Sequence, residues 1–286
     1  MNVLATADLH WNHSKSRESA AAIIEEINAE TNVDAMLIVG DVGVADGDSI
    51  EECLSRFTFT GPKLFVPGNH ELWTKRDGVD LLGDELPRRI LAAGWHWLPG
   101  APFVRDGVAI VGALGWYDYG FAVPSLEIPR VFYEAKVSPG AVIYSGEPVA
   151  LLEQARAGSR ATQELVARWN DGKFVHLGAS DGEIVSRECD AIERSLKAVA
   201  HARSALVATH TVPFAELLPP HHGGQWDFVR AYLGSPRLGE TIAWFENVCH
   251  VVCGHSHFAA EATIGHIRAT NIGSGYRAKR FARFTL

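Results

Sequence analysis

The stretch KLFVPGNHELW, residues 63–73, begins as a buried strand and ends in a cluster of polar side chains. The run at 63–66 is short and largely apolar, and the pair Pro67-Gly68 marks its end. Asn69 and His70 follow at once, in a tight loop at the carboxyl end of the predicted strand. Both residue types are common in loops, so this stretch alone is equally consistent with a plain turn. The rest of the chain decides between a turn and a site.

Apolar runs at 3–7, 35–40 and 63–66 alternate with helix-like stretches in the first hundred residues. The first of these stretches places apolar residues at helical spacing, namely Ala20, Ile23, Ile24 and Ile27. Ser14 or Ser16 is expected to cap it, a second helix begins after Asp48, and a third runs through 77–93. This order predicts a parallel sheet with helices packed on it. Strands at 102–104 and 108–114 follow, joined by a hairpin turn at Asp106-Gly107.

The character of the chain changes between about 116 and 180, where aromatic residues lie among prolines and glycines and a helical stretch follows near 148–169. An amphipathic helix then carries one apolar face, made of Ile184, Val185, Ile192, Leu196 and Val199. Further strands are predicted near 204–209, 248–253, 258–264 and 266–270. We therefore predict one domain, residues 1–286, in which 116–180 is an insertion that covers the rim of the active site.

The overall composition is that of an ordinary globular protein, with 286 residues, a net charge of −8 and 47% hydrophobic residues. No run reaches the roughly 18 apolar residues that span a bilayer, and the N-terminus lacks the basic segment of a signal peptide. Four cysteines in a chain of this length do not form a disulfide framework, so we expect a cytoplasmic location. The acidic balance and the absence of a lysine/arginine cluster argue against a nucleic-acid polymer as partner.

Five predicted strands end in side chains that can bind metal ions. They are Asp8 and His10, Asp41, Asn69 with His70, His210, and the pair His255 and His257. Loops at the carboxyl ends of strands converge at one edge of an open α/β sheet. Each of these five sets alone is weak evidence, but packing alone hardly explains all of them together.

The order of these blocks, D-x-H, G-D, G-N-H-E, a later histidine and G-H-x-H, resembles that of the calcineurin-like metallophosphoesterases from residue 8 to residue 257. The resemblance implies a four-layer α/β/β/α sandwich of two mixed sheets flanked by helices, with two metal ions. It implies seven ligands, which are Asp8, His10 and His257 for one ion, Asn69, His210 and His255 for the other, and Asp41 between them.

Imidazole, carboxylate and amide ligands suit two divalent transition-metal ions such as Mn, Fe or Zn. Two such ions can clamp a phosphoryl group and generate a hydroxide for in-line attack. The resemblance leaves His70 beside the metals as the catalytic residue, which protonates the leaving oxygen or stabilises the transition-state charge. Many relatives carry an acidic residue where this chain has Val44. Asp46, Asp48 or a backbone carbonyl would have to orient His70 instead.

Three function classes follow. The first is a phosphoesterase acting on a small phosphorylated metabolite, either a phosphodiester such as a cyclic nucleotide or a phosphomonoester. The others are a nuclease and a non-catalytic scaffold of the same fold. The aromatic cluster at 116–133 is either a base-stacking wall or a hydrophobic lid, and Trp116 and Tyr117 are predicted to contact substrate. Cys249 and Cys253 are predicted to be buried, inert thiols rather than part of a zinc site with His255 and His257.

Overall fold

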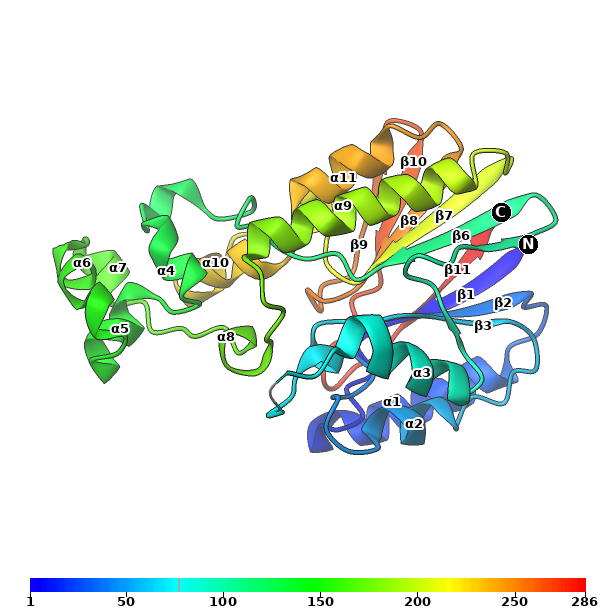
Figure 1. The fold of residues 1–286 in the computed structure, drawn as a ribbon, viewed down its shortest axis with the longest axis horizontal. Coiled ribbons are helices and arrows are strands. Elements are labelled where there is room, and N and C mark those ends of the chain that lie inside the picture. The colour runs from blue at the N-terminus through cyan, green and yellow to red at the C-terminus, as the bar shows by residue number, and fades with distance from the viewer. Residues whose placement is uncertain (77) are drawn as a thin grey trace.

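The computed structural model describes residues 1–76 and 78–286, and its two β-sheets face each other with helices on both outer sides (Figure 1). In the first sheet the parallel strands are β1 (Asn2–Thr6), β2 (Ala35–Val39), β3 (Lys63–Val66) and β4 (His96–Trp97). Strand β11 (Phe281–Thr285) pairs antiparallel with β1 at the edge of this sheet.

The second sheet has the order β5-β6-β7-β8-β10-β9. Its central strands run parallel and are β6 (Val108–Ala113), β7 (Ser204–Thr209), β8 (Val248–Cys253) and β10 (Ile267–Asn271). The edge strands β5 (Phe103–Arg105) and β9 (Ala260–Ile264) are antiparallel to their neighbours. Asp106 and Gly107 between β5 and β6 both have positive φ, as the predicted hairpin turn requires.

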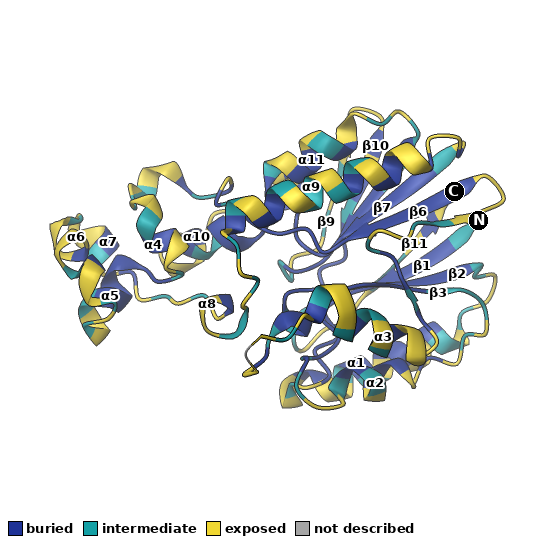
Figure 2. Cartoon of the chain, viewed as in Figure 1, coloured by how far each residue is buried: buried dark blue, intermediate teal, exposed yellow. Residues whose placement is uncertain are grey.

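Helices α1 (Ser14–Ala29), α2 (Ser49–Leu54) and α3 (Leu86–Ala92) cover the first sheet. Helices α9 (Asp181–Ala198) and α11 (Pro236–Ala243) cover the second (Figure 1). The layer between the sheets is apolar and includes Val3, Leu37, Val66, Leu206 and Val252. Figure 2 shows buried strands between helices whose outer faces are exposed. The predicted four-layer sandwich is confirmed.

Local sequence explains the helix starts. Helix α1 is capped by His13, whose Nδ1 accepts from the backbone N–H of Lys15 at 3.3 Å, and not by Ser14 or Ser16. Ser16 is buried and donates to the carbonyl of Tyr276, so its hydroxyl is already used. Helix α9 starts with a capping box in which Ser180 and Glu183 each bond the other's backbone N–H.

Residues 116–180 form an arm whose outer end, α5 to α7, projects away from both sheets (Figure 1). Its elements are η3 (Pro124–Leu126), α4 (Arg130–Glu134), α5 (Pro139–Ser145), η4 (Val149–Leu151), α6 (Leu152–Ala157), α7 (Arg160–Gln163) and α8 (Asp171–Phe174). A small core of its own, with Phe132, Val142 and Leu151, holds the outer end together. The helix predicted near 148–169 is broken, because the chain is extended at Gly158 and Ser159 caps a new turn.

Short helical turns complete the chain: η1 (His70–Leu72), η2 (Leu81–Glu85), η5 (Ala215–Leu217), α10 (Gln225–Val229) and η6 (Arg230–Tyr232). The helix predicted over 77–93 starts at Leu81, and residue 77 lies outside the described residues. Strand β11 was not predicted, because only Phe284 of its five residues is buried and the segment shows no clear alternation. No helix in the described part of the chain has the length and apolarity to cross a membrane.

Candidate metal centre and active site

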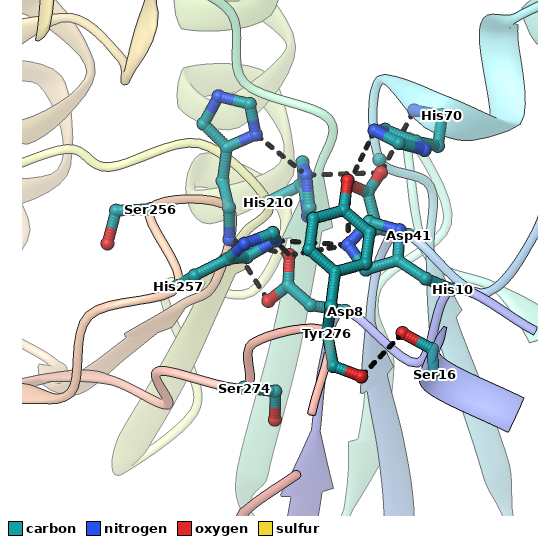
Figure 3. Close-up of polar contacts among 12 residues, drawn as sticks. Asp8, His10, Ser16, Asp41, His70, His210, Ser256, His257, Ser274 and Tyr276 are labelled. Carbon is teal, nitrogen blue, oxygen red and sulfur yellow. Dashed lines mark hydrogen bonds and ion pairs between the residues drawn. The ribbon is translucent and has the colours of Figure 1, made fainter. Parts of the chain in front are cut away.

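The side chains predicted to bind metal meet where strands β1, β2, β3, β7 and β8 end. Figure 3 shows five of them close together, namely Asp8, His10, Asp41, His210 and His257. Five of the seven hold left-handed backbone conformations, with φ of 55° at Asp8, 45° at His10, 58° at Asp41, 67° at His255 and 56° at His257. Such conformations are sparsely populated by residues other than glycine, and they cluster at functional sites. Here each one turns the chain sharply at a strand end.

Two glycines of the motifs make room for carboxylates. A Cβ on Gly68 would collide with Oδ1 of Asp41, and a Cβ on Gly254 would collide with Oδ2 of Asp8. The glycine in G-N-H-E and the one in G-H-x-H therefore let a ligand from another strand lie against the backbone.

One group of ligand atoms comes from Asp8, His10 and His257. The Nε2 atoms of His10 and His257 are 3.0 Å apart, and Nε2 of His257 is 3.5 Å from Oδ1 of Asp8. Asp8 is fully buried, and its carboxylate also accepts from the backbone N–H of His255 at 3.0 Å.

A second group comes from Asp41, His210 and His255, with the amide of Asn69 beside them. Nε2 of His210 lies 3.3 Å from Oδ1 of Asp41, 3.2 Å from Oδ1 of Asn69 and 3.1 Å from Nδ1 of His255. The other carboxylate oxygen of Asp41 is 3.8 Å from Nε2 of His10. Asp41 therefore stands between the two groups, as the resemblance implies for a bridging ligand.

The nitrogens of the second group fit a cation. Nδ1 of His210 faces the carbonyl of Val39 at 2.9 Å, and Nε2 of His255 faces the carbonyl of Tyr232 at 3.1 Å. Carbonyls only accept, so these nitrogens carry protons, and if both rings were neutral two lone pairs would point toward each other. Two acceptors 3.1 Å apart repel unless positive charge lies between them. The donor set therefore fits a bound metal ion.

Electrostatics agree with this interpretation. Burial and the neighbouring His210 lower the pKa of His255 to about 3, so that ring is neutral. Burial would also lower the pKa of His210, but Asp41 and Asp8 outweigh it and raise the pKa to about 10. The site therefore attracts a positive charge at Nε2 of His210, where a proton and a divalent ion would compete.

Glu71 ties the loops of the site together, a role the sequence did not reveal. Its buried carboxylate accepts from the backbone N–H groups of Asp41 at 2.8 Å, Val42 at 2.7 Å, Gly43 at 3.0 Å and Gly68 at 2.6 Å. Desolvation by burial raises the pKa of Glu71 to about 7. One side chain thus holds the G-D turn against the G-N-H turn.

His70 lies on the wall of the site, with Nε2 3.8 Å from Oδ2 of Asp41. Neither acidic candidate orients it. Asp46 accepts from Thr74, from the backbone of Lys75 and from Arg76, and Asp48 precedes helix α2 as its N-cap.

The site opens into a cavity of about 880 Å³. Asp41, Asn69, His70, His255 and His257 are part of its lining. The arm adds Arg168, Trp169 and Asn170, and the chain from Pro219 to Leu233 adds Trp226 and Arg230. Tyr276 also lines the cavity, and its ring stacks on that of His10 with centroids 4.7 Å apart.

The family model of the calcineurin-like phosphoesterases matches residues 1–131. The match covers the first three motif blocks, from Asp8 to His70. No curated protein matches it. Among solved structures it resembles the phosphopantetheinyl hydrolase of Mycobacterium tuberculosis, with a TM-score of 0.67 and 18% identity over 96% of this chain and 90% of that one. It also resembles a dimetal phosphatase of Danio rerio, with a TM-score of 0.54 and 12% identity over 99% of this chain and 91% of that one. At 18% and 12% identity, the similarity to these two structures shows a shared fold alone.

All seven predicted ligands lie together, with His70 beside them. Trp116 and Tyr117, in contrast, are fully buried and do not line the cavity. Trp116 donates to Asp181 at 2.7 Å and Tyr117 to Asp171 at 3.0 Å. This burial corrects the prediction that the two contact substrate, because they form the base of the arm rather than a wall of the site.

The four cysteines of the chain lie outside the predicted metal centre. Within the described residues, no group of potential metal ligands includes a cysteine, and Cys53, Cys189, Cys249 and Cys253 are all free. Cys253 is buried as predicted, whereas Cys249 is only half-buried. Burial raises the pKa of both thiols, so both stay protonated.

Proposed function

We propose that this protein is a binuclear metal-dependent phosphoesterase that hydrolyses a small phosphorylated metabolite, either a phosphodiester such as a cyclic nucleotide or a phosphomonoester. The observation that carries the proposal is the convergence of two ligand groups on Asp41, whose two oxygens lie 3.3 Å from His210 and 3.8 Å from His10. Mn, Fe or Zn are the ions we propose, because histidine nitrogens supply many of the ligand atoms.

Two divalent ions held by these residues would supply positive charge to the phosphoryl oxygens and lower the pKa of a water molecule at the site. The chain's own residues do the rest. Asp41 holds the two ligand groups at a fixed separation. His70, on the cavity wall with its Nε2 turned toward Asp41, donates a proton to the leaving oxygen as the ester bond breaks.

The cavity supports a substrate with a sizeable organic group, because about 880 Å³ exceeds what a phosphate needs. Trp169 and Trp226 line the cavity, and we propose that their rings contact such a group. Arg168 and Arg230 line the same cavity, and neither has a carboxylate within 4 Å among the described residues. We propose that these guanidinium groups bind anionic groups of the substrate beyond the phosphate that is cleaved.

A substrate screen with the manganese-loaded protein tests the proposed function. The panel holds cyclic nucleotides, bis(p-nitrophenyl) phosphate, p-nitrophenyl phosphate and a phosphopantetheinyl ester, the last because a protein of the same fold is named for that group. We expect metal-dependent hydrolysis of at least one small ester. If the protein cleaves DNA or RNA and none of the small esters, the nuclease alternative holds. If nothing is cleaved although two ions bind, the protein is a scaffold.

We place the enzyme in the cytoplasm, because its four thiols are free and cytosolic conditions keep thiols reduced. Fractionation of cells that express the protein tests this placement.

A further inference from the structure

Asp171 is a fully buried carboxylate at the start of α8, in the arm, and it contacts the metal centre directly. Its Oδ1 accepts from Nδ2 of Asn69 at 2.9 Å and from Nε1 of Trp73 at 2.7 Å. Its Oδ2 accepts from the hydroxyl of Tyr117 at 3.0 Å and from Nε1 of Trp169 at 2.8 Å. A carboxylate offers about four acceptor positions, so every one of them is used.

The bond to Asn69 determines which way that side chain points. An ionised carboxylate only accepts, so the atom of Asn69 facing Asp171 must be the amide nitrogen. The amide oxygen then points the other way, to within 3.2 Å of Nε2 of His210. If the amide were rotated by half a turn, a nitrogen with no lone pair to give would face the metal site.

We propose that Asp171 is a positioning residue that aims the amide oxygen of Asn69 at the metal held by His210 and His255. The proposal rests on the binuclear site of the proposed function but not on any substrate. Residues that bond a metal ligand from behind orient that ligand, and their loss typically weakens metal binding or activity about 10–100-fold.

The other donors connect Asp171 to the rest of the site. The indole of Trp73 stacks on His70 with ring centroids 3.7 Å apart. The indole of Trp169 packs edge-on against His255, with centroids 5.8 Å apart and planes at 77°. The carboxylate of Asp171 therefore holds the indole that packs against the ligand His255. It also holds the indole that stacks on His70, the proposed acid.

A second buried carboxylate in the same region provides a matched control. Asp181 accepts from Nε1 of Trp116 at 2.7 Å and from Nζ of Lys136 at 2.6 Å, and also from the hydroxyl of Tyr119. It contacts none of the seven ligands through a hydrogen bond among the described residues. Asp181→Asn therefore measures the cost of losing a buried acceptor without touching Asn69.

The experiment titrates metal-free protein with Mn²⁺ alone, by calorimetry and by electron paramagnetic resonance, in the parent, Asp171→Asn and Asp181→Asn. Asp171→Asn keeps the shape of the side chain but replaces one acceptor oxygen by an NH₂ donor. We expect Asp171→Asn to bind one of two Mn²⁺ ions about 10–100-fold more weakly, and Asp181→Asn to bind both as the parent does. Equal affinities in all three proteins, or equal losses in the two variants, would overturn the proposal.

A reversed pair sharpens the test. In Asn69→Asp/Asp171→Asn the NH₂ group sits at residue 171 and a carboxylate oxygen again faces His210, so Mn²⁺ affinity should recover relative to Asp171→Asn. A double variant that binds no more tightly than Asp171→Asn contradicts the positioning role.

A measurement on the parent protein does not depend on any variant folding. In protein labelled with ¹⁵N at asparagine, the side-chain NH₂ of Asn69 should exchange with solvent far more slowly than those of exposed asparagines such as Asn12. Exchange at the rate of an exposed side chain would overturn the proposal. The two experiments measure Mn²⁺ affinity and hydrogen exchange rather than turnover. The positioning role of Asp171 can therefore fail while the proposed function holds, and the proposed function can fail while the positioning role holds.

Discussion

The indole of Trp73 lies nearly flat against the imidazole of His70, with ring centroids 3.7 Å apart and planes inclined by 22°. Nδ1 of His70 is buried and has no hydrogen-bond partner among the described residues. The histidine proposed as general acid is therefore held by an aromatic face, where many relatives use an acidic residue. The hydrogen bond from Trp73 to Asp171 in turn keeps the indole in place.

Loss of this aromatic face should lower turnover. Trp73→Leu should reduce kcat on alkyl phosphate esters roughly 3–10-fold, because aromatic pairs contribute about 0.5–1.5 kcal/mol beyond burial. Trp73→Phe retains a ring but no N–H, so it should stay close to the parent. Steady-state kinetics decide the matter. If the Phe variant falls as far as the Leu variant, the bond to Asp171 matters and the stacking does not.

His70→Asn should show whether His70 is an acid. An alkoxide leaves poorly without a proton, whereas p-nitrophenolate leaves well unaided. We expect a loss of about 10²–10⁴-fold on alkyl esters, a clearly smaller loss on p-nitrophenyl esters, and unchanged metal content. A uniform loss on both substrate classes would indicate charge stabilisation at phosphorus instead. Loss of bound metal would show that His70 is a ligand.

Asp41→Ala should lower the occupancy of both metal positions, because Asp41 lies between the two ligand groups. Metal analysis of purified protein should give close to two ions per chain for the parent, and chelation should abolish activity. Asp46→Asn is the control, since Asp46 follows in the same loop but bonds Thr74 and Arg76 rather than the site. Parent-like metal content in Asp41→Ala would make the ligand assignment wrong.

Glu71→Gln should destabilise the fold. The glutamine NH₂ would face two of the four backbone N–H groups that Glu71 now accepts from, and buried donors without a partner cost about 1–3 kcal/mol each. Urea unfolding should therefore show a loss of about 2–4 kcal/mol. Glu52→Gln, at a half-exposed side chain that accepts from Trp11 and forms an exposed ion pair with Arg17 at 3.7 Å, should change stability little. Equal stabilities of the Glu71 variant and the parent would contradict the role given to Glu71.

Glu188 should make stability depend on pH. Burial raises the pKa of this side chain to about 7, although the backbone N–H of Gly115 donates to it at 3.0 Å. Between the usual pKa of 4.5 and about 7 the folded protein holds more protons than the unfolded chain, so stability falls as pH rises. Glu188→Gln cannot ionise. The melting temperature of the parent should therefore drop relative to this variant from pH 5 to pH 8, and a constant difference across that range would refute the shift.

The layers of the fold and the residues that meet at the candidate metal centre could be predicted from sequence, because both depend on local signals that recur in order. Apolar runs indicate the buried strands, and short motifs directly after them indicate the ligands, as with Asp41 after β2 and His210 after β7. Strand β11 was not predicted because an edge strand buries few side chains, so its sequence shows little alternation of apolar and polar residues.

The supporting residues could not be predicted. Asp171 lies in the sequence Asn170-Asp171-Gly172, which has the composition of an ordinary turn, and nothing near it marks a link to Asn69, about a hundred positions earlier. Trp116 and Tyr117 are aromatic residues of a kind that occurs both in substrate-binding pockets and in protein cores. Only the packing of the arm against the sandwich shows that they are interior.

The five ligand residues with positive φ have a consequence for protein engineering. A left-handed conformation costs roughly 1–2 kcal/mol for most residues, less for aspartate and asparagine, whereas glycine adopts it freely. A library selected only for heat resistance should therefore accumulate glycine at positions such as His10, His255 and His257. The most thermostable variants would be those that had lost the metal ligands. A selection for a more stable enzyme therefore has to screen for bound metal at every round.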